Sequence, residues 1–129
     1  MPVEIRILTW SICLGIAYVL VSATLTTSAR GLNWNVGNRD AEAPRLSGGA
    51  GRAHRANRNF LETFPFFAAA VLAVVLLKVN SSHTTLGAQL YFWARLVYLP
   101  VYIIGIPYVR SLVWGVSLWG ILMLLAALF

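Results

Sequence analysis

Long apolar runs separated by short polar segments dominate this chain. Residues 7–29 carry no charge over 23 positions, residues 66–77 are wholly apolar, and residues 111–129 carry no charge over 19 positions. A helix needs about 20 apolar residues to cross a hydrocarbon core of about 30 Å. The pattern therefore predicts an all-α membrane protein, a bundle of four transmembrane helices in a single domain. The predicted domain covers residues 1–129, with spans at about 5–29, 52–79, 86–106 and 108–129.

Polar segments and helix breakers mark the limits of these spans. Residues 30–50 contain four glycines, one proline and three asparagines, which is typical of a loop, and Ser47 is the predicted N-cap of the second helix. Residues 78–85 form a short polar turn, and Gly105 and Pro107 mark the turn before the last span. A cleaved signal peptide is an alternative for the first run, but the run exceeds the usual 7–15 residues.

The composition supports the membrane class. The chain is 59% hydrophobic and 11% charged, with a mean hydropathy of +0.74, whereas soluble domains are about 45–50% apolar and about 25% charged. A soluble chain this short has too little interior to hide that much apolar surface. Cys13 is the only cysteine, which excludes an internal disulfide and a cysteine-based metal site. We expect no metal site, because His54 and His83 fall on opposite sides of the membrane in this topology.

Positive charge is concentrated around one loop. The formal net charge is +6, and six of the ten basic residues lie between Arg30 and Arg58. Apolar segments flank this cluster on both sides, so we expect no nucleic-acid partner. The excess of Lys and Arg predicts that the loop between the first two spans is cytoplasmic and that both termini lie outside. The charged residues counted for this loop are Arg30, Arg39, Asp40, Glu42, Arg45 and Arg52.

Two of the predicted helices carry a polar stripe into the bilayer. At about 100° per residue, one stripe covers about 80° of the second helix and the other covers about 60° of the third. A charged residue near the bilayer centre costs about 2.5–3.5 kcal/mol on insertion scales, so these residues are expected to face a partner or a water-filled cavity. The first stripe consists of Arg52, Arg55, Asn59 and Glu62, and the second of Tyr91, Arg95, Tyr98 and Tyr102.

Simpler interpretations of both stripes remain open. Tyrosines near helix ends are typical of the aromatic belt at the membrane interface, and arginines at a span end are typical of a positive-inside cluster. Glu62 and Arg95 are also suited to a purely structural ion pair between the second and third helices.

Four short motifs resemble one known family. The sequence R-A-N-R-N-F-L-E-T-F-P over residues 55–65 resembles the second-helix pattern of the MAPEG family, the membrane-associated proteins of eicosanoid and glutathione metabolism. The sequence W-A-R-L-V-Y-L-P-V-Y over residues 93–102 is similar to the third-helix pattern. Arg110-Ser111 resembles the Arg-Ser pair of the prostaglandin E synthase branch, and Ala29-Arg30 also fits. The chain looks like a short bacterial-type member.

The resemblance implies a homotrimer. It also implies that glutathione, as co-substrate, binds between neighbouring subunits in a site that opens to the cytoplasmic side. It implies that Arg110 faces the thiol as a catalytic residue, and a tyrosine or Ser111 is the alternative hydrogen-bond donor to the sulfur. The glutathione-binding residues that it implies are Arg30, Arg55, Asn59, Glu62, Arg95, Tyr98 and Tyr102.

The implied function is that of an integral membrane glutathione-dependent transferase or peroxidase that acts on a lipophilic electrophile in a bacterial inner membrane. Arginine forks suit the two carboxylates of glutathione, and Glu62 suits its ammonium group. A free thiol has a pKa of about 8.5, and a nearby guanidinium stabilises its thiolate. The expected partners are further copies of the chain, membrane lipid and the lipophilic small-molecule substrate.

Two other functions remain as alternatives. One is a non-catalytic MAPEG-fold membrane protein that binds a lipid or a small anionic ligand. The other is a small transporter subunit, against which the lack of an inverted repeat or paired broken helices argues.

Overall fold

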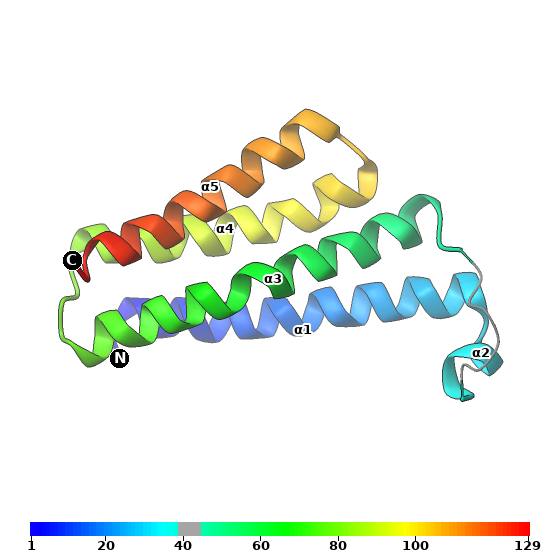
Figure 1. Cartoon of the computed structure of the whole chain (residues 1–129), viewed down its shortest axis with the longest axis horizontal. Helices are drawn as coiled ribbons and strands as arrows, with labels where there is room; N and C mark the ends of the chain where they lie inside the picture. The colour runs from blue at the N-terminus through cyan, green and yellow to red at the C-terminus, as the bar shows by residue number, and fades with distance from the viewer. Residues whose placement is uncertain (39–44) are drawn as a thin grey trace.

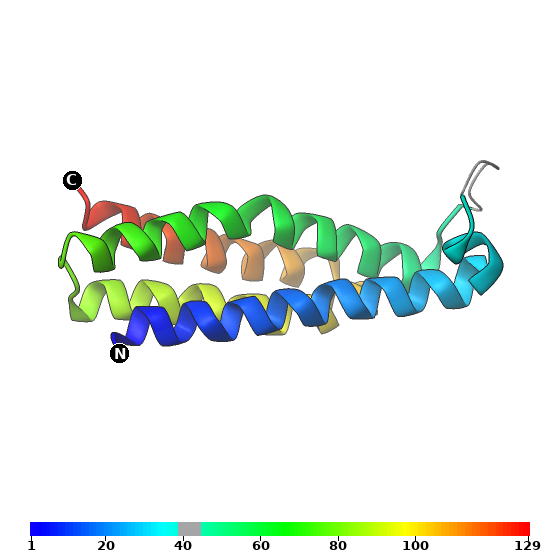
Figure 2. The same cartoon turned by 90° about the horizontal axis from the view of Figure 1, so that it is seen from below.

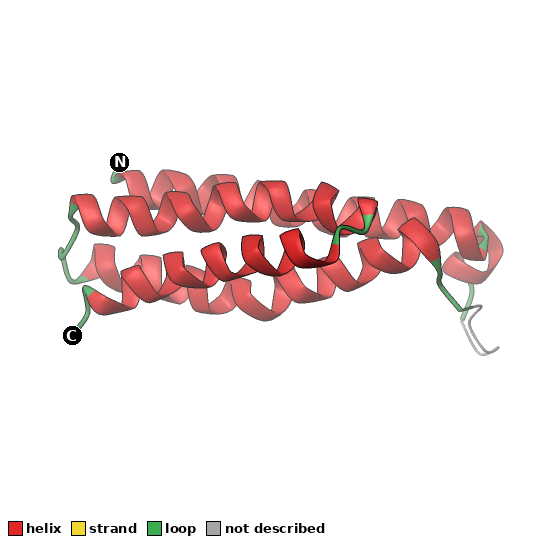
Figure 3. Ribbon diagram, turned by 90° about the horizontal axis from the view of Figure 1, so that it is seen from above, coloured by secondary structure: helices red, strands yellow, loops and turns green. Residues whose placement is uncertain are grey.

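The protein is described by a computed structural model that covers residues 1–38 and 45–129. Its helices are α1 (Val3–Arg30), α2 (Leu32–Val36), α3 (Gly48–Leu76), α4 (Ser82–Ile104) and α5 (Pro107–Ala126). The four long helices lie side by side in an elongated bundle, with α2 at one end (Figure 1). Both termini lie at the opposite end, as two perpendicular views show (Figures 1 and 2). Short connections join α3 to α4 and α4 to α5 (Figure 3).

Each long helix coincides with one of the apolar segments, although the ends differ by a few residues. For example, α3 begins at Gly48 rather than at residue 52. Three helices, α1, α3 and α5, are long and apolar enough to cross a membrane. The fourth, α4, has 23 residues, but polar side chains such as Gln89 and Arg95 lower its hydropathy. Its crossing of the membrane therefore stays a prediction.

The segment between α1 and α3 differs from the expected loop. The short helix Leu32–Val36 lies within the predicted 30–50 loop. The sequence did not predict this helix, because five residues are too few to show a helical period. Ser47 occupies the N-cap position of α3 as predicted, but its side chain makes no capping hydrogen bond. The charges predicted at Arg39, Asp40 and Glu42 lie outside the described residues.

Two capping motifs build the turn between α3 and α4. After α3, Lys78 adopts the left-handed conformation, with φ of 57°. The Val79 N–H then donates to the Val74 carbonyl at 3.1 Å, as in a Schellman motif. At the start of α4, the Thr84 N–H donates to Ser81 Oγ at 3.2 Å, and the Ser81 N–H donates to Thr84 Oγ1 at 2.8 Å. These bonds satisfy backbone groups that helix ends otherwise leave without partners.

Glu4 fastens the start of α1 to the start of α4. Its side chain is buried and accepts hydrogen bonds from Thr84 Oγ1 at 2.6 Å and from Thr85 Oγ1 at 3.1 Å. The positive end of the α4 dipole lies at the same place and favours a carboxylate there. The bundle is thus held together at the end that carries both termini.

Aromatic side chains fill the centre of the bundle between α1, α3 and α4. Tyr18 stacks on Phe60 with ring centroids 4.6 Å apart, and Phe67 stacks on Tyr91 at 3.9 Å. The Tyr18 hydroxyl donates to the Arg95 carbonyl at 2.5 Å, so the buried hydroxyl group has a hydrogen-bond partner. These contacts place α3 and α4 so that Asn59 and Thr63 of α3 lie against Arg95 of α4.

Close backbone contact between α4 and α5 depends on Gly87 and Gly120. A Cβ atom on Gly87 would lie 2.8 Å from the Gly120 carbonyl oxygen, and one on Gly120 would lie 2.9 Å from the Tyr91 nitrogen. Small residues at such contacts let helices in a membrane approach closely. This contact orients α5, whose first turn carries Arg110.

Candidate functional site

Arg95 lies at the centre of the polar contacts between α3 and α4. It is fully buried, and its guanidinium donates to Asn59 Oδ1 at 2.7 Å and to Thr63 Oγ1 at 2.8 Å. The guanidinium carbon lies 4.9 Å from the centroid of the Tyr98 ring and 5.7 Å from that of the Tyr91 ring. Neutral oxygens and aromatic faces therefore surround the buried charge. Arg95 joins the two predicted stripes, mainly as a bond between helices.

The structural ion pair considered for Glu62 and Arg95 is wrong. Glu62 instead lies 3.5 Å from Arg58 Nε, and both side chains are mostly exposed, at 62% and 77%. The buried face of α3 is centred on Phe60, which is 1% exposed. Thr63 lies about 60° from Phe60 around the helix, and Glu62 lies about 160° from it. Packing turns the Thr63 side toward α4, so Glu62 points away from the bundle.

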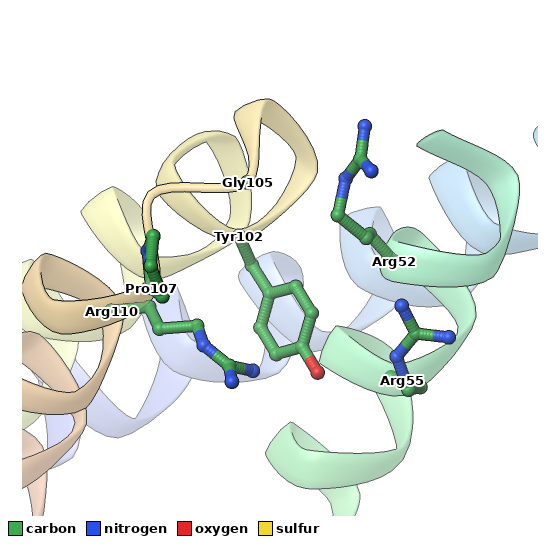
Figure 4. Close-up of a pocket in the computed structure, with 6 residues that line it drawn as sticks. All are labelled: Arg52, Arg55, Tyr102, Gly105, Pro107 and Arg110. Atoms are coloured by element: carbon green, nitrogen blue, oxygen red, sulfur yellow. The ribbon is translucent and has the colours of Figure 1, made fainter. Parts of the chain in front are cut away.

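A cavity of about 440 Å³ lies where the start of α3, the end of α4 and the start of α5 meet. Arg52 and Arg55 reach it from α3, the Tyr102 ring projects into it from α4, and Arg110 reaches it from α5 (Figure 4). Part of its wall consists of Gly105, which ends α4 in the left-handed αL conformation, and Pro107, the first residue of α5. We call this space the arginine cavity; its lining residues are Arg52, Arg55, Tyr102, Gly105, Pro107 and Arg110.

The arginine cavity is strongly electropositive. Its described lining residues include three arginines and no acidic residue. The Arg110 guanidinium lies over the Tyr102 ring, 4.7 Å from its centroid, which offsets part of the repulsion between the charges. A cleft lined by charges of one sign attracts ligands of the opposite sign. Guanidinium groups also pair with carboxylates and phosphates through two parallel hydrogen bonds. The cavity is therefore suited to an anionic ligand.

A second cavity, of about 460 Å³, lies beside the first, and Arg110 lines both. Its wall combines aromatic rings with the Asn59 amide, and the Ser111 hydroxyl donates to the Pro107 carbonyl at 3.4 Å. Space is open beside Gly115, where an added Cβ would meet no atom within 4 Å. We call this space the tryptophan cavity; its lining residues are Asn59, Tyr98, Arg110, Ser111, Trp114 and Gly115.

The structure separates the predicted site residues into two groups. Six of them line the two cavities, and Arg95 lies behind these six in the bundle core. The six are Arg55, Asn59, Tyr98, Tyr102, Arg110 and Ser111. Glu62 and Arg30 are not among the described lining residues of either cavity. Arg30 instead lies over the Trp34 ring, 4.9 Å from its centroid.

Five lining residues are missing from the predicted site residues, and two of these, Arg52 and Trp114, carry large polar or aromatic side chains. Arg52 belongs to the predicted stripe, and its position three residues before Arg55 is the signal that would have included it. Trp114 belongs to no motif, but it lies four residues after Arg110, one helical turn along the same face of α5.

The sequence model of the MAPEG family matches residues 7–129, nearly the whole chain. No curated protein matches the sequence. The matched region includes the 55–65 and 93–102 motifs, and these lie on the stretches of α3 and α4 that form the two cavities.

Proposed function

Because the chain belongs to the MAPEG family, whose members include glutathione transferases and peroxidases, we propose that it is a glutathione-dependent transferase or peroxidase in the membrane. Its substrate would be a lipophilic electrophile that reaches the site from the bilayer. The arginine cavity is the observation that carries the proposal, because three arginines converge there from α3 and α5. Such a cluster is suited to the two carboxylates of glutathione.

The two adjoining cavities suggest how the reaction is divided. Arg55 would hold a carboxylate in the arginine cavity, while Arg110, which lines both cavities, would lie close to the thiol. Its positive charge lowers the thiol pKa, so the proton passes to water without a dedicated base. The thiolate sulfur then forms a bond to the electrophilic carbon, and the displaced group leaves with the electron pair. The aromatic wall of the tryptophan cavity would hold the apolar part of the electrophile.

The homotrimer is part of the proposal. Glu62 and Arg58 form an exposed ion pair about three turns into α3, where facing lipid is costly. A neighbouring subunit packed on this face would shield the pair, and in a ring of three subunits the Glu62 of each subunit would then lie near the arginines of the next. We therefore propose that glutathione binds between subunits, with the ammonium on Glu62. Chemical crosslinking in mild detergent should give trimers, and a purely monomeric protein would reject this arrangement.

The topology is proposed with the trimer. The four spans follow from the apolar segments. The cytoplasmic first loop and the external termini follow from the arginine count, in a bacterial inner membrane. Reporter fusions after Gly49 and at the C-terminus should report opposite sides. Two fusions on the same side would contradict four spans.

A non-catalytic protein that binds a lipid headgroup or a small anion is the second candidate. It is favoured by the position of Glu62, because a single protomer offers cations for an anion but no described carboxylate for an ammonium group. This candidate needs neither a trimer nor an activated thiol.

Calorimetry on the purified protein distinguishes the two candidates. Three ligands would be compared: glutathione, its analogue without the amino group, and inorganic phosphate. If glutathione is the ligand, Glu62→Gln should weaken its binding and leave the binding of the deaminated analogue unchanged. Ultraviolet thiolate absorbance near neutral pH, and turnover of an aryl halide or a lipid hydroperoxide, would then establish catalysis. Binding of phosphate without binding of glutathione at millimolar concentration would support the second candidate and refute the first.

A further inference from the structure

Arg52 makes a contact that the other two arginines of the cavity do not make. Its Nε donates to the Ile103 carbonyl at 2.7 Å. Ile103 lies in the last turn of α4, where carbonyl groups have no partner within the helix. The carbonyl of Val101, in the same turn, is satisfied by the backbone N–H groups of Gly105 and Ile106. Arg52 thus reaches from α3 to complete the end of α4.

The stem of Arg52 also packs on the turn that follows. Gly105 has φ of 89° in the left-handed region, and a Cβ atom there would lie 3.5 Å from Arg52 Nε. Figure 4 shows the guanidinium of Arg52 on the Gly105 side of the cavity, whereas Arg55 and Arg110 lie near the hydroxyl and the ring of Tyr102. The three arginines therefore do not form one equivalent set.

We infer that Arg52 is a positioning residue, which caps α4 and holds the Gly105–Pro107 turn against α3. The cavity then presents Arg55 and Arg110 to a ligand, while Arg52 sets the distance between them. Two physical effects stabilise this contact. A cation is favoured at the negative end of a helix dipole, and a charged donor makes a stronger hydrogen bond to a carbonyl than a neutral one does.

The position of Arg110 depends on this contact, because Arg110 lies in the first turn of α5, three residues after Pro107. If the turn is released, α5 is still held near its other end by Gly87 and Gly120. The first turn of α5 would then move more freely, and Arg110 would sample positions farther from Arg55. The catalytic consequence of this inference rests on the proposed glutathione chemistry, but its structural part does not.

Hydrogen exchange of the turn tests the structural part. In Arg52→Gln, we expect the backbone amides over residues 105–110 to exchange about 10-fold faster than in the wild type, as local opening becomes easier. Arg55→Gln is the matched control, since it removes a neighbouring arginine of the same cavity and should leave this exchange unchanged. If Arg52→Gln does not yield folded protein, Arg52→Met replaces it, because methionine is flexible and apolar and brings neither a charge nor a hydrogen-bond donor to the Ile103 carbonyl. Unchanged exchange in the folded Arg52 variant would overturn the inference.

A double-mutant cycle tests the functional part. With an aryl halide as electrophile, Arg52→Gln should lower kcat/KM about 10-fold in the wild-type background and less than about 2-fold in the Arg110→Gln background. Arg55→Gln should cost the same factor in both backgrounds, because it binds the ligand directly. Equal effects of Arg52→Gln in both backgrounds would show that Arg52 acts independently of Arg110. If the wild type does not bind glutathione, the proposed function fails, while the exchange experiment still decides the role of Arg52.

Discussion

Replacing Arg95 with methionine tests whether the buried guanidinium holds α3 and α4 together. The substitution removes the donors to Asn59 Oδ1 and Thr63 Oγ1, at 2.7 and 2.8 Å. A hydrogen bond to a charged group contributes about 1.5–3 kcal/mol in soluble proteins, whereas bonds between membrane helices average about 0.6 kcal/mol. Methionine is flexible and fills much of the same space, so the lost polar contacts dominate the effect.

The two partners of Arg95 should not contribute equally. Thr63 Oγ1 keeps a contact of 3.3 Å with the Tyr91 hydroxyl and one of 3.2 Å with the Phe60 carbonyl. Asn59 Oδ1 has no second partner among the hydrogen bonds of the described residues, and it would be left unsatisfied. Taking about 2 kcal/mol for Asn59 and about 0.5–1 kcal/mol for Thr63, we expect a loss of about 2–3 kcal/mol in unfolding free energy.

Reversible unfolding in mixed detergent, followed by tryptophan fluorescence, measures this loss. Arg6→Met is the matched control, because Arg6 is exposed and its replacement should change stability by less than about 0.5 kcal/mol. Asn59→Leu should lower the unfolding free energy less in the Arg95→Met background than alone. In that background the buried guanidinium, which would otherwise lose its acceptor at Asn59, is already absent. An Arg95→Met protein as stable as the Arg6→Met control would refute the reasoning.

Three further predictions concern the site and two turns. Arg110→Ala should lower conjugation of a hydrophobic electrophile by about 100-fold, as expected for a two-unit change in the thiol pKa, with little change in glutathione affinity, whereas Arg55→Ala should mainly weaken binding; full activity of Arg110→Ala in steady-state kinetics would assign thiol activation to another residue. Gly120→Ala should lower stability by about 1–3 kcal/mol, because the new Cβ meets backbone atoms of α4, while Gly115→Ala, with open space around it, should show no loss in the same unfolding assay. Lys78→Gly should raise stability by about 1 kcal/mol, because it relieves a left-handed φ of 57°; an unchanged or lower unfolding free energy would contradict this.

Several features of the fold and site follow from the sequence because they depend only on local periodicity. The uncharged runs at 7–29 and 111–129 predict helices that the structure confirms as α1 and α5. Helical spacing alone also places Arg52, Arg55 and Asn59 on one face, and all three line the cavities. No knowledge of neighbouring helices is needed for these statements, since residues three or four apart lie side by side on any helix.

The partners of the polar residues that bond between helices were decided only by the tertiary structure. Helical periodicity places a side chain on a face to within several tens of degrees, and that tolerance includes both Glu62 and Thr63. Packing of α3 against α4 chose Thr63 and Asn59 as acceptors for Arg95 and left Glu62 outside the bundle. Likewise, the bond from Arg52 to the Ile103 carbonyl joins residues 51 positions apart. A backbone carbonyl at a helix end carries no signature in the sequence, so only the arrangement of the helices in space could identify it.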